Sequence, residues 1–323
     1  MSVYPYKFEP VYKEKIWGGR ALERLFGRAL PAGAKIGESW ELADLPEGQS
    51  VVSGGPDFGK TLGSLLAEKA DEILGHDIAP DDGRFPLLLK LLDANDILSL
   101  QVHPDEQSAA ELGPPAKFKT ECWYILESRG GYILKGVRPG VTEADFRKAI
   151  AAEAEGWENA FDDLLVRFDV CAGDFHYLPA GTVHALGPGV VVAEIQTPSY
   201  TTYRVSDWGR GREVHVAEAL KCIHFEPGPD SPPGAGGDVL VSTPWFAVRR
   251  LVIPAGERQT DAGECKAWMA LAGKGQITCG ELDKPVSIFT GDTILLPAGI
   301  KEPSLAAEEQ MTLLEITIPK TKS

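Results

Sequence analysis

The chain lacks several features that mark particular classes of protein. It has five cysteines, an odd number, and no two of them form a Cys-x-x-Cys pair. This pattern argues against a disulfide framework and against a zinc ribbon, and it is typical of a reduced, cytoplasmic protein. No apolar run approaches the roughly 20 residues of a membrane-spanning helix, and residues 1–17 lack the apolar centre of a signal peptide.

Positive charge is also scarce. The sequence has 32 lysines and arginines against 47 aspartates and glutamates, which gives a net charge of −15. Such a balance argues against nucleic acid and membrane surfaces as partners, because both attract basic patches. A phosphorylated small molecule is still compatible with this charge, since a few local cations can oppose the field of the whole chain.

The sequence does contain a repeated pattern. It occurs at residues 173–184 and again at 291–302, and each copy has Gly, five residues, Pro, one residue, Gly and two residues before a final position. That final position is His184 in the first copy and Glu302 in the second. The repeat predicts two related β-units, with a metal ligand kept in the first and absent from the second.

Alternating prolines and glycines at residues 226–238 predict a linker, because neither helix nor strand continues through them. We therefore expect two domains, at residues 1–225 and 239–323. Short β-like runs separated by turns after the linker indicate a sandwich or barrel. Before the linker, strands are expected at 37–42, 97–103, 121–126, 131–135, 175–179 and 190–196, and helical insertions at about 60–76 and 142–168, the second including a helix at 158–168.

Two of these strands bring metal-ligand side chains onto common faces. Because strand side chains alternate with period two, Gln101 and His103 share one face. For the same reason Glu121 shares a face with Lys119. Imidazole and carboxylate groups suit zinc or a similar divalent ion, and three protein ligands with an open position are typical of a catalytic site. The predicted metal ligands are His103, Glu121 and His184, with Gln101 offering a fourth oxygen.

These motifs resemble those of a known family. The spacing within residues 173–184 is similar to the second motif of the cupins. The run from about residue 5 to 215 resembles the type I mannose-6-phosphate isomerases in their short bacterial form, and the remainder resembles a degenerate cupin. The motifs that carry the resemblance are Trp17-Gly-Gly19, Gly37-Glu-Ser-Trp-Glu41, Gln101-x-His103, Lys119-x-Glu121 and residues 194–210.

The resemblance implies a mainly β fold of two cupin-type jelly-roll units, with helical insertions in the N-terminal part. It also implies one zinc ion per chain, held by the four ligands predicted above, and interconversion of mannose 6-phosphate and fructose 6-phosphate through an enediol(ate). The expected partner is a phosphosugar, and the expected state is a monomer or a weak homodimer. The resemblance points to Lys90, Ser99, Lys119 and Arg204 as substrate-binding residues, with catalytic roles for Lys90, Lys119 and Arg204. We also expect Glu194 to bind substrate if strand 190–196 faces the site; the alternative is a structural salt bridge from Glu194 to Arg204.

Several alternatives stay open. The general base could be a zinc-associated water, His103, Lys119 or Glu194. Longer family members carry a Tyr two residues after the last His ligand, where this chain has Leu186. The competing functions are a non-catalytic sugar-binding or regulatory cupin, an isomerase of a related 6-phosphosugar, and a metal-dependent oxygenase on the same scaffold.

Overall fold

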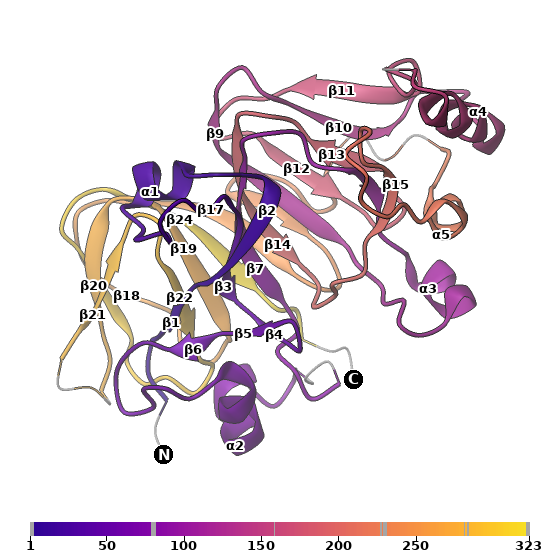
Figure 1. Cartoon of the computed structure of the whole chain (residues 1–323). Coiled ribbons are helices and arrows are strands. Elements are labelled where there is room, and N and C mark those ends of the chain that lie inside the picture. Colours follow the sequence, from indigo (N-terminus) through magenta and orange to yellow (C-terminus); the bar gives the residue numbers. More distant parts are fainter. Residues whose placement is uncertain are drawn as a thin grey trace.

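Antiparallel β-sheets form the framework of the chain, and the helices lie around them (Figure 1). The predicted mainly β fold class is therefore confirmed. The computed structural model describes residues 3–78, 82–157, 159–226, 228, 231–280, 282 and 284–320.

Two sheets form what we call the first unit. Side chains from both sheets meet in one buried cluster, which contains Trp123 of one sheet and Leu186 of the other. The larger sheet has the order β12 (Phe175–Leu178), β9 (Glu121–Ser128), β14 (Val190–Gln196), β7 (Leu88–Ala94), β3 (Ile36–Leu42) and β2 (Val11–Gly19). The smaller sheet has the order β11 (Leu165–Asp169), β10 (Tyr132–Val137), β13 (His184–Leu186), β8 (Leu100–Val102) and β15 (Tyr203–Ser206).

Two further sheets form what we call the second unit. The larger has the order β16 (Val239–Ser242), β17 (Ala247–Ile253), β24 (Met311–Thr317), β19 (Lys266–Ala272), β22 (Thr293–Leu296), β1 (Tyr6–Glu9) and β6 (Val51–Val52). The smaller has the order β18 (Gly256–Gln259), β23 (Ser304–Ala307), β20 (Lys274–Thr278) and β21 (Val286–Phe289). A short ribbon pairs β4 (Asp44–Leu45) with β5 (Gly48–Gln49).

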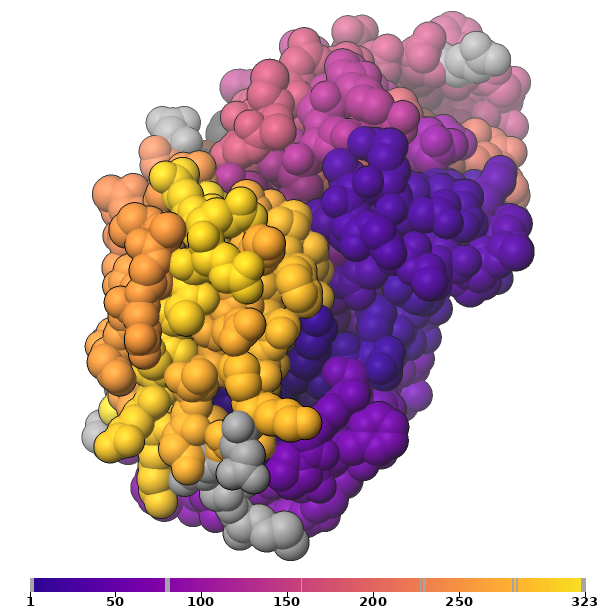
Figure 2. Space-filling view, turned by 90° about the vertical axis from the view of Figure 1, so that its left-hand side faces the viewer, coloured from indigo at the N-terminus to yellow at the C-terminus, as the bar shows by residue number. Residues whose placement is uncertain are grey.

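The second unit includes strands from the beginning of the chain. Tyr6 of β1 pairs with Leu295 of β22, so the N-terminal strand lies beside the C-terminal ones. Figure 2 shows early and late parts of the chain, in indigo and yellow to orange, next to one another at the surface. One apolar core also joins the units, since it contains residues of β7, β14 and β24 together. The division at the linker stays a prediction, and residues 227, 229 and 230 of that linker lie outside the described residues.

Local sequence signals explain the longer helices. Thr61 caps α2 by accepting a hydrogen bond from the Ser64 backbone, and Thr142 forms a capping box with Asp145 at the start of α4. Both helices match the predicted insertions. No described helix combines the length and the apolar character needed to cross a membrane. The helices are α1 (Ala21–Phe26), α2 (Leu62–Leu74), α3 (Glu106–Leu112), α4 (Glu143–Ala154) and α5 (Val216–Cys222).

Two predicted elements need correction. The helix expected at 158–168 is wrong: residues 159–164 form turns and the chain then enters β11, while residue 158 lies outside the described residues. Gly156 and Asn159 both adopt positive φ, which ends α4 and prevents a second helix from starting. The strand expected at 97–103 is also shorter, since β8 contains only Leu100–Val102.

Candidate active site

Strand pairing places the predicted site residues around one position in the first unit. In the smaller sheet β8 lies between β13 and β15, so Gln101 pairs with His184 on one side and with Arg204 on the other. In the larger sheet β14 lies between β9 and β7, so Glu194 pairs with Trp123 and with Lys90. Both sheets direct these side chains toward the space between them.

Three of the predicted metal ligands converge and are buried. His103, Glu121 and His184 each offer one ligand atom, and these atoms lie within 4.8 Å of one another. The Nε2 atom of His103 is 3.4 Å from Glu121 Oε2, and the Nε2 atom of His184 is 3.4 Å from Glu121 Oε1. The two histidines come from the smaller sheet or its edge and the glutamate from the larger, so the cluster bridges the sheets.

The hydrogen bonds of the cluster fit a divalent cation. The Nδ1 atom of His103 lies 2.9 Å from the carbonyl oxygen of Thr201, and that of His184 lies 2.8 Å from the carbonyl oxygen of Thr182. Each Nδ1–H therefore donates to a carbonyl, which leaves each Nε2 lone pair directed at Glu121. Neither carboxylate oxygen of Glu121 has a hydrogen-bond partner, although the Nζ atom of Lys119 forms an ion pair with Oε2 at 2.9 Å. A buried carboxylate and two imidazole nitrogens that converge on one space are an arrangement that a metal can satisfy.

The protonation states also fit metal binding. Burial and the nearby Lys119 ammonium lower the pKa of His103 to about 3, and burial lowers the pKa of His184. Burial alone would raise the pKa of Glu121, but Lys119 and His103 outweigh it and hold that pKa well below its usual range. The cluster is thus two neutral imidazoles and one carboxylate, the forms that bind a metal.

Lys119 and Gln101 connect the cluster to the neighbouring cavity. The Nζ atom of Lys119 is 2.9 Å from Glu121 Oε2 and 3.0 Å from His103 Nε2. The Nε2 atom of Gln101 is 3.3 Å from His184 Nε2, and its Oε1 accepts a hydrogen bond from Ser99 at 3.2 Å. Direct ligation by Gln101 requires a half-turn of its amide, which would bring Oε1 toward the histidine, and it stays a prediction.

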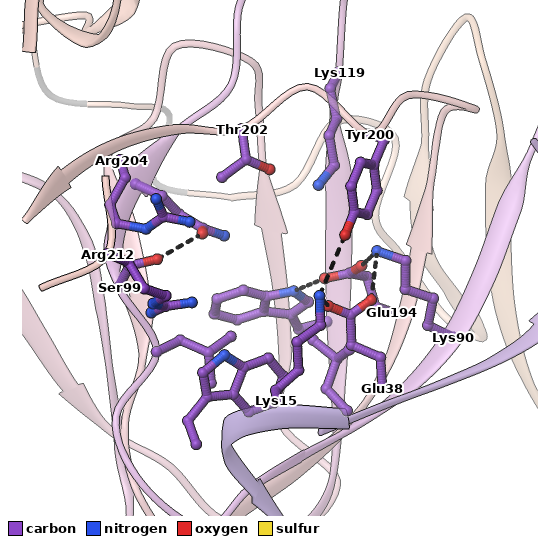
Figure 3. Close-up of a pocket in the computed structure, with 15 residues that line it drawn as sticks. Lys15, Glu38, Lys90, Ser99, Lys119, Glu194, Tyr200, Thr202, Arg204 and Arg212 are labelled. Atoms are coloured by element: carbon purple, nitrogen blue, oxygen red, sulfur yellow. Dashed lines mark hydrogen bonds and ion pairs between the residues drawn. The ribbon is translucent and has the colours of Figure 1, made fainter. Parts of the chain in front are cut away.

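A cavity of about 200 Å³ opens beside the cluster (Figure 3). Its lining has five cationic side chains against two carboxylates, in a chain whose net charge is −15. A polar cavity with this surplus of positive charge suits an anionic ligand. The predicted residues in the lining are Lys90, Ser99, Gln101, Lys119, Glu194 and Arg204. The other lining residues are Lys15, Trp17, Glu38, Leu92, Leu98, Trp123, Tyr200, Thr202 and Arg212.

On one side of the cavity, lysines and carboxylates alternate. Lys15 pairs with Glu38 at 2.8 Å, and Lys90 pairs with Glu194 at 2.9 Å and with Glu38 at 3.8 Å. Burial would raise the pKa of Glu38, but the ammonium groups of Lys90 and Lys15 lower it to about 2. The Nε1 atom of Trp123 donates to Glu194 at 2.9 Å. These four ion-paired side chains therefore compensate one another's charge.

Sequence reasoning missed several lining residues for a physical reason. Lys15, Tyr200 and Arg212 reach the cavity from β2 and from loops that are distant in sequence, and no local spacing encodes that convergence. One signal for Glu38 was available, because a charged residue in a strand whose seven positions are all buried needs a partner. Leu186, at the position where the resemblance leads one to look for a Tyr, is buried in the core, and the phenol in the lining belongs to Tyr200.

Known proteins are similar to this chain in both sequence and fold. A family model described as phosphomannose isomerase type I, catalytic domain, matches residues 6–125. The mannose-6-phosphate isomerase of Streptococcus mutans serotype c is 36% identical over 305 residues, covering 89% of this chain and 90% of that protein. The crystal structure of the mannose 6-phosphate isomerase from Bacillus subtilis has a TM-score of 0.83 at 33% identity, covering 98% of this chain and 100% of that chain.

A more distant likeness concerns the fold alone. A structure of mannose 6-phosphate isomerase bound with zinc and yttrium has a TM-score of 0.76 at 18% identity, covering 98% of this chain and 100% of that chain. Together with the closer matches, it confirms the cupin-type fold expected from the sequence. The identity and coverage of the closer matches show that the chain belongs to the family of type I mannose-6-phosphate isomerases.

Proposed function

We propose that this chain interconverts mannose 6-phosphate and fructose 6-phosphate. The observation that carries the proposal is the buried cluster of His103, Glu121 and His184 beside a cavity with surplus positive charge. An aldose–ketose isomerase needs a polarising centre for the oxygens on C1 and C2, a group that moves a proton between those carbons, and an anchor for the phosphate. The names of the relatives support the same reaction.

The proposed cofactor is one zinc ion per chain. His103, Glu121 and His184 would hold it, with Gln101 as the fourth ligand after its amide turns. The nitrogen and oxygen donors suit zinc, and one fold neighbour is named as zinc-bound. Bound at such a site, the ion supplies Lewis-acid polarisation of the substrate oxygens.

The chain's own residues divide the remaining tasks. Lys119 lies against the metal ligands and lines the cavity, so its ammonium can stabilise negative charge that develops on a substrate oxygen. Lys90 is buried between Glu194 and Glu38, and it forms ion pairs with both carboxylates at the cavity wall. Arg204 presents a guanidinium from β15 and can bind an anionic oxygen.

The candidates for the general base differ in access to the substrate. His103 is poorly suited, because its Nδ1–H donates to Thr201 and its Nε2 faces the metal position. Glu194 and Lys119 both line the cavity. Exchange of solvent deuterium into C1 and C2 distinguishes these two residues. The variant that removes the base, either Glu194→Gln or Lys119→Met, should lose this exchange together with turnover.

The two parts of the chain have different proposed roles. We assign the chemistry to residues 1–225 and a structural or covering role to residues 239–323. The proposed partner is a small phosphosugar, the proposed state a monomer or weak homodimer, and the proposed location the cytoplasm, on the cysteine content argued above.

A coupled assay with mannose 6-phosphate tests the function. Zinc-loaded protein should form fructose 6-phosphate, chelator-treated protein should not, and added zinc should restore the activity. A fully metallated sample that binds mannose 6-phosphate without converting it would contradict the isomerase and indicate a sugar-binding cupin. Faster conversion of another 6-phosphosugar would correct the substrate.

A further inference from the structure

The side of the cavity opposite the paired lysines carries two arginines. Arg204 comes from β15 and Arg212 from the loop that follows it, and both line the cavity with Ser99. Figure 3 draws these three residues together on one side, facing Glu38 and Glu194 across the space. We call Ser99, Arg204 and Arg212 the arginine wall.

The positive charge of Arg204 has no carboxylate partner among the described residues. Arg204 forms no ion pair with any of them, and its Nη1 donates only to the backbone carbonyl of Glu213. Its Nε is buried and has no hydrogen-bond partner. Burial and the nearby Arg212 guanidinium lower the pKa of Arg204. An unpartnered buried donor on a cation is costly unless a ligand accepts from it.

Arg212 and Arg210 share the carboxylate of Asp207. The Nε atom of Arg212 donates to Asp207 Oδ1 at 2.9 Å, and Arg210 donates to the same oxygen at 3.0 Å. One negative charge thus serves two arginines, while Arg204 beside them has none among the described residues. Arg210 also approaches Asp96 at 3.6 Å, but Arg210 does not line the cavity. The arginine wall therefore keeps a surplus of positive charge.

The other cations of the cavity are compensated. Lys15 and Lys90 are paired with Glu38 and Glu194, and Lys119 is paired with Glu121. The uncompensated charge of the lining is thus concentrated at one place, where two planar guanidinium groups can donate together. The Ser99 hydroxyl lies with them and donates to Gln101 Oε1 in this structure, so it can turn to a ligand only by leaving that amide. Guanidinium forks match the oxygen geometry of a phosphate, which carries up to two negative charges.

We propose that Arg212, with Arg204 and Ser99, binds the phosphate group of the substrate and selects phosphorylated over free sugars. The inference rests on the proposed function for the sugar, but phosphate binding itself needs no turnover. The neutralised lysine–glutamate side then faces the sugar hydroxyls, and the metal ligands face the reacting end. Arg212 is the specificity-determining residue in this arrangement, because Arg204 also borders Gln101 and the metal cluster.

The test compares Arg212→Met with Arg210→Met. Both variants remove one arginine from Asp207, but only Arg212 lines the cavity, so Arg210→Met controls for the fold of the loop. The Arg212 backbone still donates to Asp207 Oδ2 at 3.1 Å in either variant, which keeps the loop anchored. Thermal denaturation of both variants checks that they fold alike.

Calorimetric titration of zinc-loaded protein with inorganic phosphate gives the first readout, and kinetics with mannose 6-phosphate gives the second. In Arg212→Met we expect the Kd for phosphate and the KM to rise by about 10- to 100-fold, as for loss of a charge-assisted hydrogen bond, with a much smaller change in kcat. Arg212→Lys should recover part of the affinity, and Arg210→Met should stay near wild type.

Equal phosphate affinity in Arg212→Met and Arg210→Met would overturn the proposal. So would a fall in kcat with an unchanged KM, because Arg212 would then act on the chemistry. Wild-type protein that fails to convert mannose 6-phosphate, yet loses phosphate binding on Arg212→Met, would contradict the proposed function and leave the phosphate site standing.

Discussion

The two units contain the same three-residue arrangement, and among the described residues only the first unit has the candidate metal cluster of His103, Glu121 and His184 beside it. In the first unit Glu194 of β14 accepts a hydrogen bond from Trp123 of β9 at 2.9 Å and pairs with Lys90 of β7 at 2.9 Å. Strand register places Glu194 directly opposite both partners. The arrangement thus crosses three neighbouring strands, with the carboxylate in the middle.

In the second unit Glu315 of β24 has the corresponding position. It accepts from Trp268 of β19 at 3.0 Å and pairs with Arg249 of β17 at 3.4 Å, and it again lies opposite both in the register. The cation, carboxylate and tryptophan therefore recur in the same strand order. This recurrence supports the duplication that the repeated sequence pattern suggested.

The difference lies two residues before each tryptophan. Glu121 stands there in the first unit and Lys266 in the second, each opposite the Leu that precedes the Pro of the repeated pattern. Lys266 is buried and lies 3.9 Å from Glu315. The second unit thus holds a buried lysine where the first holds the carboxylate of the candidate metal cluster. The comparison teaches that both units have the same strand framework. A few exchanged side chains distinguish the unit with the candidate metal cluster from the unit without it.

Replacing the last residue of each repeated pattern should give the largest contrast. We expect His184→Ala to lower activity by more than about 100-fold, because even an outer-shell partner of a metal is worth on the order of 10- to 100-fold. Glu302→Ala, at the equivalent position, should keep wild-type activity. The coupled assay at saturating zinc measures both, and an active His184→Ala would show that the units are not divided as described.

Removing one buried lysine from each unit should destabilise the protein by different amounts. Lys90→Met leaves Glu194 and Glu38 short of a partner, and breaking a buried ion pair costs about 3–5 kcal/mol. Lys266→Met should cost only about 1 kcal/mol, since Glu315 keeps Trp268 and Arg249. Urea denaturation at neutral pH measures the free energy of unfolding of each variant. Equal losses in Lys90→Met and Lys266→Met would show that the ion pairs do not set the difference in stability.

The ionised state of Glu38 should make stability depend on pH. Its pKa in the folded chain is about 2, against an ordinary value of 4.5 for Glu, so its contribution is complete above about pH 4.5 and is lost as pH falls through 2. The shift corresponds to about 3 kcal/mol at order of magnitude. Glu38→Gln should flatten the stability profile over this acid range, as followed by urea denaturation. An unchanged slope would place the acid sensitivity elsewhere.

The smallest contrast concerns the tryptophans. Trp123→Phe and Trp268→Phe each remove one hydrogen bond to a buried carboxylate, which costs about 2 kcal/mol in both units. Only Trp123 lines the cavity, so only its variant should also raise the KM for mannose 6-phosphate. A KM effect from Trp268→Phe would link the second unit to catalysis.

Sequence patterns predicted what local chemistry determines. The Pro-x-Gly turn before His184, the Thr142 capping box and the alternation around Gln101 and His103 each depend on a few neighbouring residues. The matching arrangements around Glu194 and Glu315 could not be found in this way, because their members meet only through strand pairing and register. The pairing of β1 with β22 is hidden for the same reason, since it joins opposite ends of the chain.

The metal content of the purified chain tests the central claim most directly. Native mass spectrometry of zinc-loaded protein should give one zinc ion per chain for wild type and for Glu302→Ala, and none for Glu121→Gln. Two ions in wild type, or one ion retained by Glu121→Gln, would contradict the account, because the metal would then bind outside the cluster of His103, Glu121 and His184.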